Sequence, residues 1–162
     1  MAVRIKKIPQ TLEEFTSMPQ QDLSNPENTC ALFLCALQLY LEDQNDGLAA
    51  IDLLRGPRPM LPYDKQFLRD RLRGKEYLPM AYFEGADPSN NYVPAKPYTL
   101  NVLPDPRGNS TQEGYLKVFI KTAGADSPRP VTLRRKGSSW YLWEYSSILT
   151  GIRIPAAEEL WT

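Results

Sequence analysis

Three stretches near the end of the chain decide the fold: GYLKVFIKT at 114–122, PVTLRRK at 130–136 and SSWYLWEYSS at 138–147. In the first stretch, Leu116, Val118 and Ile120 alternate with other residues, and the second stretch alternates in the same way. A period of two is typical of strands with one buried face. The glycine-containing segment 136–139 joins two such strands, so we expect a β-hairpin there. The three stretches together predict an antiparallel meander.

The residues before this meander have helical patterns. Asn25 is a natural N-cap and Pro26 suits the first position of a helix. The run CALFLCALQLYL at 30–41 is apolar almost all round, which indicates a helix from 26 to 41 that is buried on most sides. Further helices are predicted at 47–54 and 63–73, with a short one after Thr11, which begins a capping box with Glu14.

Because the helices come first and the strands follow, the sequence predicts an α+β fold. We expect one domain over residues 1–162, in which N-terminal helices pack on a C-terminal curved antiparallel sheet of about four strands. Its parts are a leader segment at 1–25, a helical part at 26–83 and the sheet at 98–154. A small SH3-like β-barrel with a helical cap is the alternative.

Composition limits the chemistry of this chain. Lys and Arg number 19, Asp and Glu number 19, and there is no histidine. A net charge of zero argues against nucleic acid as a partner, although Arg69, Arg71 and Arg73 are the place to look for a local basic patch. The lack of histidine excludes Ser-His-Asp and Cys-His catalysis and histidine-ligated metals. Nucleotide-binding glycine motifs are also absent, so we expect no metal and no cofactor.

The cysteines and the hydropathy bear on the compartment. Cys30 and Cys35 are too far apart on a helix for an undistorted disulfide, and buried free cysteines indicate a reducing compartment. No stretch approaches the roughly 20 apolar residues of a membrane helix. We therefore expect a cytoplasmic protein without a membrane partner, in which the Asn109-Ser110-Thr111 sequon is not glycosylated.

The hairpin PVTLRRKGSSWYLWEYSS at 130–147 resembles those that close the sheet of cystatin-like and NTF2-like domains. The resemblance implies a cone-shaped α+β fold in which Trp140 and Leu142 point inward. NTF2-like enzymes place an Asp, His or Tyr inside the cone, and this chain departs from the Asp–His versions. The ending SSWYLWEYSSILTGIRIP is similar to the ends of uncharacterised bacterial proteins grouped as a domain of unknown function, which implies no activity.

The candidate site lies on the last strand. Strict alternation puts Trp140, Leu142 and Glu144 on one face, and on the other the three aromatic residues Tyr141, Trp143 and Tyr145. The outward aromatics need a cover, for which the polar loop at 84–96 is one candidate and a second subunit or a ligand is another. A buried Glu144 would be a candidate general base, whereas an ion pair with Arg134 or Arg135 would make it structural. The candidate binding residues are Tyr141, Trp143, Tyr145, Glu144 and Arg134.

Three hypotheses for the function follow. The first is a non-catalytic cytoplasmic interaction or assembly domain, with a protein partner or a homodimer formed through the aromatic face. The second is a small-molecule binding domain with a pocket between the helix at 26–41 and the sheet. The third is a histidine-free enzyme that uses Glu144 and a tyrosine.

Overall fold

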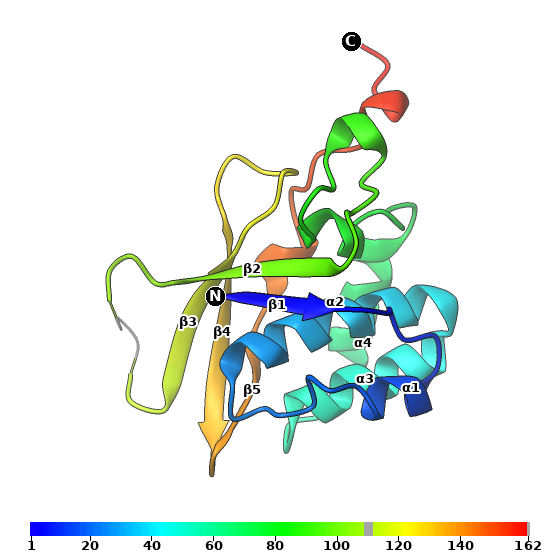
Figure 1. Ribbon diagram of the computed structural model, residues 1–162. Helices are drawn as coiled ribbons and strands as arrows, with labels where there is room; N and C mark the ends of the chain where they lie inside the picture. The colour runs from blue at the N-terminus through cyan, green and yellow to red at the C-terminus, as the bar shows by residue number, and fades with distance from the viewer. Residues whose placement is uncertain (109–111, 162) are drawn as a thin grey trace.

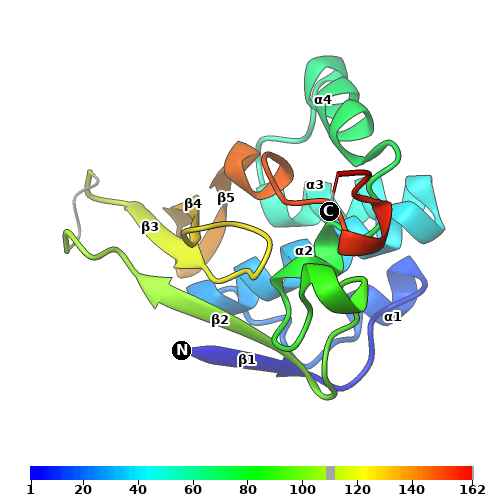
Figure 2. The same cartoon turned by 90° about the horizontal axis from the view of Figure 1, so that it is seen from above.

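A computed structural model describes residues 1–108 and 112–161 of the chain, so the Asn109-Ser110-Thr111 sequon lies outside the described residues. The helices gather on one side of a curled antiparallel sheet (Figure 1). The view from above shows the same two layers, with α2 beside the sheet and α4 farthest from it (Figure 2). The α+β prediction is therefore confirmed.

The elements have the following bounds. The helices are α1 Leu12–Thr16, α2 Pro26–Glu42, α3 Gln44–Arg55 and α4 Pro62–Leu72. The strands are β1 Ala2–Ile5, β2 Tyr98–Pro104, β3 Tyr115–Ile120, β4 Arg129–Lys136 and β5 Ser139–Glu144. Short 3-10 helices are η1 Pro79–Tyr82, η2 Pro88–Asn90, η3 Ser146–Leu149 and η4 Ala156–Glu158.

The sheet has five strands in the order β1-β2-β3-β4-β5, and all pairs are antiparallel. The additional strand comes from the predicted leader, because β1 pairs with β2 through Val3 opposite Leu100. The leader is thus part of the fold. The strand order leaves β1 and β5 as two edges, so the described strands form an open sheet and not the alternative closed barrel.

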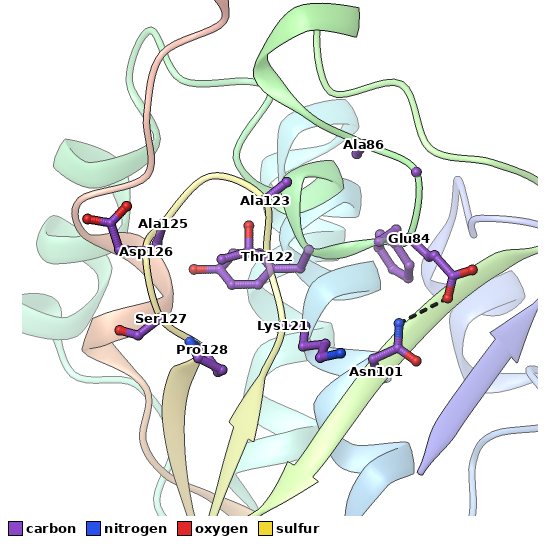
Figure 3. Close-up of a pocket in the computed structure, with 13 residues that line it drawn as sticks. Glu84, Ala86, Asn101, Lys121, Thr122, Ala123, Ala125, Asp126, Ser127 and Pro128 are labelled. Atoms are coloured by element: carbon purple, nitrogen blue, oxygen red, sulfur yellow. Dashed lines mark hydrogen bonds between the residues drawn. The ribbon is translucent and has the colours of Figure 1, made fainter.

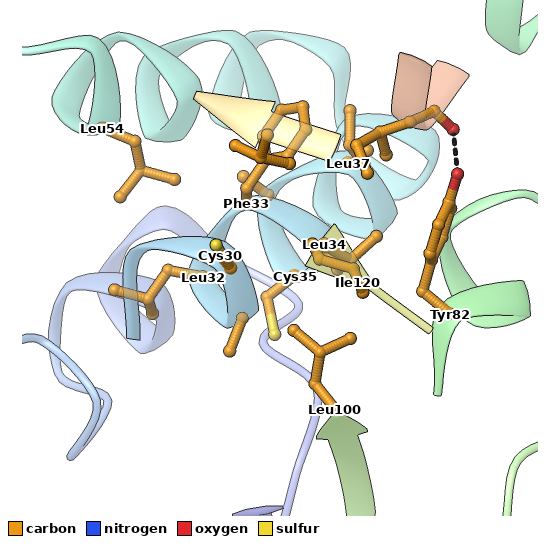
Figure 4. Packing of buried hydrophobic residues seen from close by; sticks show 14 of the residues in the cluster. Cys30, Leu32, Phe33, Leu34, Cys35, Leu37, Leu54, Tyr82, Leu100 and Ile120 are labelled. Carbon is orange, nitrogen blue, oxygen red and sulfur yellow. Dashed lines mark hydrogen bonds between the residues drawn. The ribbon is translucent and has the colours of Figure 1, made fainter. Parts of the chain in front are cut away.

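Helix α2 forms the centre of the core, and its ends follow the sequence prediction. The Asn25 side chain accepts a hydrogen bond from the Glu27 amide at 3.1 Å, with Pro26 at the first helical position. Every residue from Thr29 to Leu37 is buried. Figure 4 shows Phe33, Leu34 and Leu37 of α2 among side chains from the sheet and from η1. Burying side chains of this size stabilises the fold by about 1.5–3 kcal/mol each.

The sheet has a buried inner face and a half-exposed outer face. Alternation along the strands places seven apolar residues against the helices: Leu100, Val102, Val118, Ile120, Val131, Leu133 and Leu142. The outer face carries residues that are exposed or half-buried, among them Leu103, Tyr115, Lys117, Phe119, Thr132 and Arg134. This division explains why the strand pattern was readable from sequence.

The loop at 84–96 does not cover the last strand, so the prediction that it acts as its lid is wrong. Tyr92 in this loop stacks on Tyr77 with the ring centres 5.3 Å apart, and its hydroxyl donates to the Arg153 carbonyl at 2.6 Å. The loop lies beside the C-terminal segment, away from the β4–β5 turn (Figure 1). The segment that reaches the last strand is instead the α3–α4 connection, where Gly56 is in contact with Tyr141.

The two cysteines of α2 are free and fully buried, as predicted. Burial raises the pKa of the Cys30 and Cys35 thiols to about 12, which keeps both neutral and unreactive. Among the described residues, no helix combines the length and apolarity that crossing a membrane requires.

Candidate functional site

Strand β5 carries an irregularity that changes which side chains share a face. Leu142 pairs with Leu133, but Glu144 pairs with Thr132, so Trp143 is an extra residue in a β-bulge. Tyr141, opposite Arg134, stays on the outer face. Tyr145 instead lies 4.7 Å from the Phe33 ring of α2, on the inner side. The prediction that Tyr145 shares a face with Tyr141 and Trp143 is therefore wrong, because the bulge and the end of β5 interrupt the alternation.

The Trp143 ring is surrounded by cationic and aromatic groups. The Arg58 guanidinium lies 4.3 Å from the ring centre and the Arg134 guanidinium 4.6 Å from it. The Tyr115 ring meets Trp143 edge-on at 5.5 Å. Cation–π contacts of this kind are worth about 0.5–1 kcal/mol at exposed sites and more where water is excluded. These contacts cover the Trp143 ring. The sequence had left open whether a loop, a second subunit or a ligand would cover it.

Arg58 comes from the α3–α4 connection and also binds the edge of the sheet. Its Nη2 donates to the Trp143 carbonyl at 2.7 Å and more weakly to the Leu142 carbonyl at 3.5 Å. Burial lowers the pKa of Arg58, and the positive charge of Arg55 lowers it further. An arginine keeps its charge under such shifts, so two cations remain close together at this edge.

Arg55 ties the end of α3 to α4 and to the residue after β5. Only 4% of its side chain is exposed. Its Nη1 donates to the Tyr145 hydroxyl at 2.8 Å and its Nη2 to the Asp64 carboxylate at 3.3 Å, while Nε donates to the Arg58 carbonyl at 2.9 Å. Burial raises the pKa of Tyr145, so this phenol stays protonated at neutral pH. The role of Arg55 is to fix the α3–α4 connection against the strand.

These groups surround a cavity of about 360 Å³, which we name the basic pocket. Its lining is Arg55, Pro57, Arg58, Arg134, Arg135, Lys136, Tyr141, Leu142 and Trp143. Five of these side chains are cationic, and none is acidic. Asp64 pairs with Arg55 from outside this lining. The cluster therefore has an excess of positive charge beside aromatic and apolar surface, an arrangement suited to an anionic ligand.

Glu144 lies outside the basic pocket. Its side chain is exposed, and its carboxylate accepts a hydrogen bond from the Ser146 amide at 2.8 Å. It faces Thr132 across the strand pair, whereas Arg134 faces Tyr141. The predicted ion pair with Arg134 or Arg135 is not among the salt bridges of the described residues. Glu144 thus serves as a local cap after β5, without the burial that a general base would require.

A second cavity, of about 500 Å³, lies where β2 and β3 meet the loops at 84–86 and 122–128 (Figure 3). Its charges are largely matched by partners. The Glu84 carboxylate accepts from the Asn101 amide at 3.0 Å, and Asp126 pairs with Arg153. Lys121 points into this hollow (Figure 3). The second cavity therefore lacks the charge excess that distinguishes the basic pocket.

The sequence named Tyr141, Trp143 and Arg134 as binding residues, and the structure brings these three together in the basic pocket. The sequence did not indicate Arg55 and Arg58, because their approach to β5 depends on the path of the α3–α4 connection. The arginines proposed for a local patch lie elsewhere, since Arg69 bonds Gln66 and Arg71 lies over Phe67, both on α4. Within the described residues no group of three or more potential ligands is placed to hold a metal ion.

Comparisons with known proteins place the chain in a family without an assigned activity. A family model described as a domain of unknown function, DUF6935, matches residues 7–156. Neither the curated proteins nor the solved structures include a match to this chain.

Proposed function

The chain belongs to the DUF6935 family, whose function is unknown, and we propose that it is a non-catalytic interaction domain that binds an acidic, aromatic-containing segment of a protein partner in the basic pocket. The observation that carries the proposal is the lining itself, which has five cationic side chains and no carboxylate next to Tyr141 and Trp143. Carboxylates of a partner would pair with Arg134 and Arg135, and an aromatic side chain would lie against Tyr141 and Pro57.

A protein segment suits this pocket better than a nucleic acid. Proteins that bind single strands offer free aromatic faces for base stacking and a basic groove that follows the backbone. Here the Trp143 ring already contacts Arg58 and Arg134, so it does not offer a free face for stacking on a base. The cations surround one cavity of about 360 Å³, and the chain as a whole has no net charge.

The site also lacks support for the enzyme hypothesis. Glu144 is exposed and accepts a hydrogen bond from a backbone amide, and Tyr145 is a half-buried phenol whose hydroxyl accepts a hydrogen bond from Arg55. Glu144 and Tyr145 line one cavity of about 360 Å³ together with Arg55 and Arg58, but the Tyr145 hydroxyl already accepts from Arg55 and the Glu144 carboxylate from the Ser146 amide, so each group has a structural partner. We further propose that the protein is cytoplasmic, because two buried free thiols persist best in a reducing compartment. We also propose a bacterial origin and a cystatin-like or NTF2-like relationship for the fold.

Binding of model peptides tests the proposal. A fluorescein-labelled peptide of glutamates and tyrosines is titrated with the protein and followed by fluorescence anisotropy, beside a peptide in which glutamines replace the glutamates. We expect the acidic peptide alone to bind, with an affinity that falls steeply as ionic strength rises. The double variant Arg134→Ala/Arg135→Ala should bind about tenfold more weakly, the sum of two exposed charge pairs of about 0.7 kcal/mol each.

The matched control is Lys117→Ala/Lys121→Ala, which removes the same charge from β3 and its end, outside the basic pocket. It should bind the acidic peptide as the unmodified protein does. Equal losses in the two double variants would show that general charge and not the pocket attracts the peptide. Tighter binding of a single-stranded oligonucleotide than of the peptide would overturn the choice of a protein partner.

A further inference from the structure

The last described residues of the chain expose an acidic and apolar segment. Leu160 is 88% exposed and Trp161 is 93% exposed, and both follow Glu158 and Glu159. The Glu159 carboxylate accepts a hydrogen bond from the Trp161 amide at 3.0 Å, which shapes the segment into a turn. A fully exposed tryptophan beside a leucine is unusual on a monomer and is a frequent anchor of protein interfaces. We name residues 156–161 the tail.

The tail and the basic pocket have complementary chemistry. The pocket has four cations besides Arg55, which is already paired with Asp64, and they lie beside Tyr141 and Trp143. The tail offers two carboxylates next to Leu160 and Trp161. The cavity volume of about 360 Å³ is near the lower end of those that hold small ligands, which suits one large side chain. The tail thus matches the kind of partner segment that the proposed function requires.

The tail of one molecule does not reach its own pocket. Pro155 is buried, and Arg153, two residues earlier, donates a hydrogen bond from its backbone amide to the Gly124 carbonyl at 2.9 Å and forms an ion pair with Asp126. The six residues after Pro155 extend at most about 20 Å, whereas a domain of this length is about 40 Å across. Figure 1 places the C-terminus at one end of the molecule and the β4–β5 turn at the other.

We propose that the tail of one molecule docks in the basic pocket of a second copy of this chain. This inference rests on the proposed function and names a second copy as the partner. The contact joins two different surfaces and is therefore heterologous, so repeating it produces either a closed ring or an open chain of subunits. The family match at 7–156 contains every residue of the pocket and ends before Glu158.

Sedimentation equilibrium of the full chain tests this docking. The weight-average mass should rise with protein concentration at low ionic strength and return to that of a monomer at high ionic strength. Trp161→Ala should weaken association at least tenfold, because an exposed tryptophan is a frequent anchor of protein interfaces. Glu158→Arg/Glu159→Arg should abolish it, while Glu13→Arg/Glu42→Arg, with the same charge change on α1 and α2, should leave it intact.

Charge reversal on both sides identifies the surfaces. Arg134→Glu/Arg135→Glu should be monomeric alone, yet should associate when mixed with Glu158→Arg/Glu159→Arg. If circular dichroism shows that the pocket variant is unfolded, a competition experiment replaces the mixing experiment. In it, a free peptide of residues 156–161 should dissociate assemblies of the unmodified chain. A chain that stays monomeric at every concentration, or assemblies that the peptide leaves unchanged, would overturn the inference.

Peptide binding by the Trp161→Ala variant tests the proposed function separately from self-docking. The Trp161→Ala variant keeps an intact pocket and should still bind the labelled glutamate–tyrosine peptide. If this variant binds that peptide while the unmodified chain never associates, self-docking is wrong and the acidic-segment function stands. If the variant binds neither that peptide nor the peptide of residues 156–161, both proposals fail together.

Discussion

The Arg58 guanidinium lies 4.3 Å from the centre of the Trp143 ring and donates a 2.7 Å hydrogen bond to the carbonyl oxygen of the same residue. One side chain thus holds both the ring and the backbone of a bulged edge strand. Near the start of the same strand, the Trp140 amide donates a hydrogen bond to the Leu23 carbonyl at 2.7 Å. The Trp140 carbonyl accepts a hydrogen bond from the Thr29 hydroxyl at 2.8 Å. Edge strands with free backbone groups invite pairing with other chains, and these contacts cover β5.

Replacement of Arg58 by alanine should lower the free energy of unfolding by about 2 kcal/mol. The loss combines a charge-assisted hydrogen bond to a carbonyl, at about 1.5 kcal/mol or more, with a cation–π contact of about 0.5–1 kcal/mol. Urea denaturation followed by tryptophan fluorescence measures the change. Arg135→Ala is the control, since this exposed side chain only approaches the Trp140 ring at 5.7 Å and should cost less than about 0.5 kcal/mol. Equal losses of unfolding free energy in the two variants would contradict the role of Arg58 in holding the ring and backbone of Trp143.

Replacement of Arg55 by lysine should destabilise the protein by about 2–3 kcal/mol, although the charge is retained. The Arg55 guanidinium donates to three acceptors from one buried plane, which an ammonium on a flexible stem does not reproduce. Tyr145→Phe removes only one of these acceptors and should cost about 1 kcal/mol. Thermal unfolding by calorimetry separates these values, and an Arg55→Lys variant as stable as the unmodified protein would remove the case for a geometric role.

The helical part was predictable because its signals are local. The cap at Asn25, the proline at position 26 and the apolar run that follows all act within one helix, and α2 begins where they indicate. The strands of the meander were readable because each has one buried face. β1 was harder, because Ala2–Ile5 is a short edge strand whose partner, β2, lies about a hundred residues later in the chain.

The candidate site was predictable only in part. Tyr141, Trp143 and Arg134 belong to one hairpin, so their proximity follows from strand register. Arg58 comes close to them because of the path of the α3–α4 connection, a segment without a periodic sequence pattern from which its position could be predicted. The Tyr145 error has a different cause, since a bulge of one residue shifts every later side chain to the other face, and no residue of SSWYLWEYSS marks its position.

Gly47 should resist replacement by alanine, although alanine is the better helix former by about 1 kcal/mol. A Cβ atom added at Gly47 of α3 would lie 2.2 Å from the Cα of Tyr40 in α2, a contact with rigid backbone. We expect Gly47→Ala to cost more than about 3 kcal/mol, because α2 and α3 would have to separate at this contact. Gly74→Ala is the control, since its Cβ would meet nothing within 4 Å and only its φ of +70° is unfavourable. A loss near 1 kcal/mol is expected there, and urea denaturation compares the two.

Stability should fall at alkaline pH because of the two cysteines. Burial raises the pKa of each thiol from the ordinary 9.0 to about 12 in the folded state. Below pH 9 both states keep these protons, so stability is unaffected by them there. Between pH 9.0 and about 12 the unfolded chain loses protons that the folded chain retains, which favours unfolding.

The slope should reach about 1.4 kcal/mol per pH unit for each thiol, and urea midpoints measured from neutral pH to about pH 10 determine it. The double variant Cys30→Ala/Cys35→Ala should be less stable at neutral pH, because it leaves small voids in α2 packing, yet its stability should decline less steeply with pH. Buried tyrosines such as Tyr82 also have a raised pKa, so the difference between the two slopes, and not either slope alone, reports the thiols. Identical slopes would mean that the cysteines ionise in the folded protein, which requires that water reaches them inside α2.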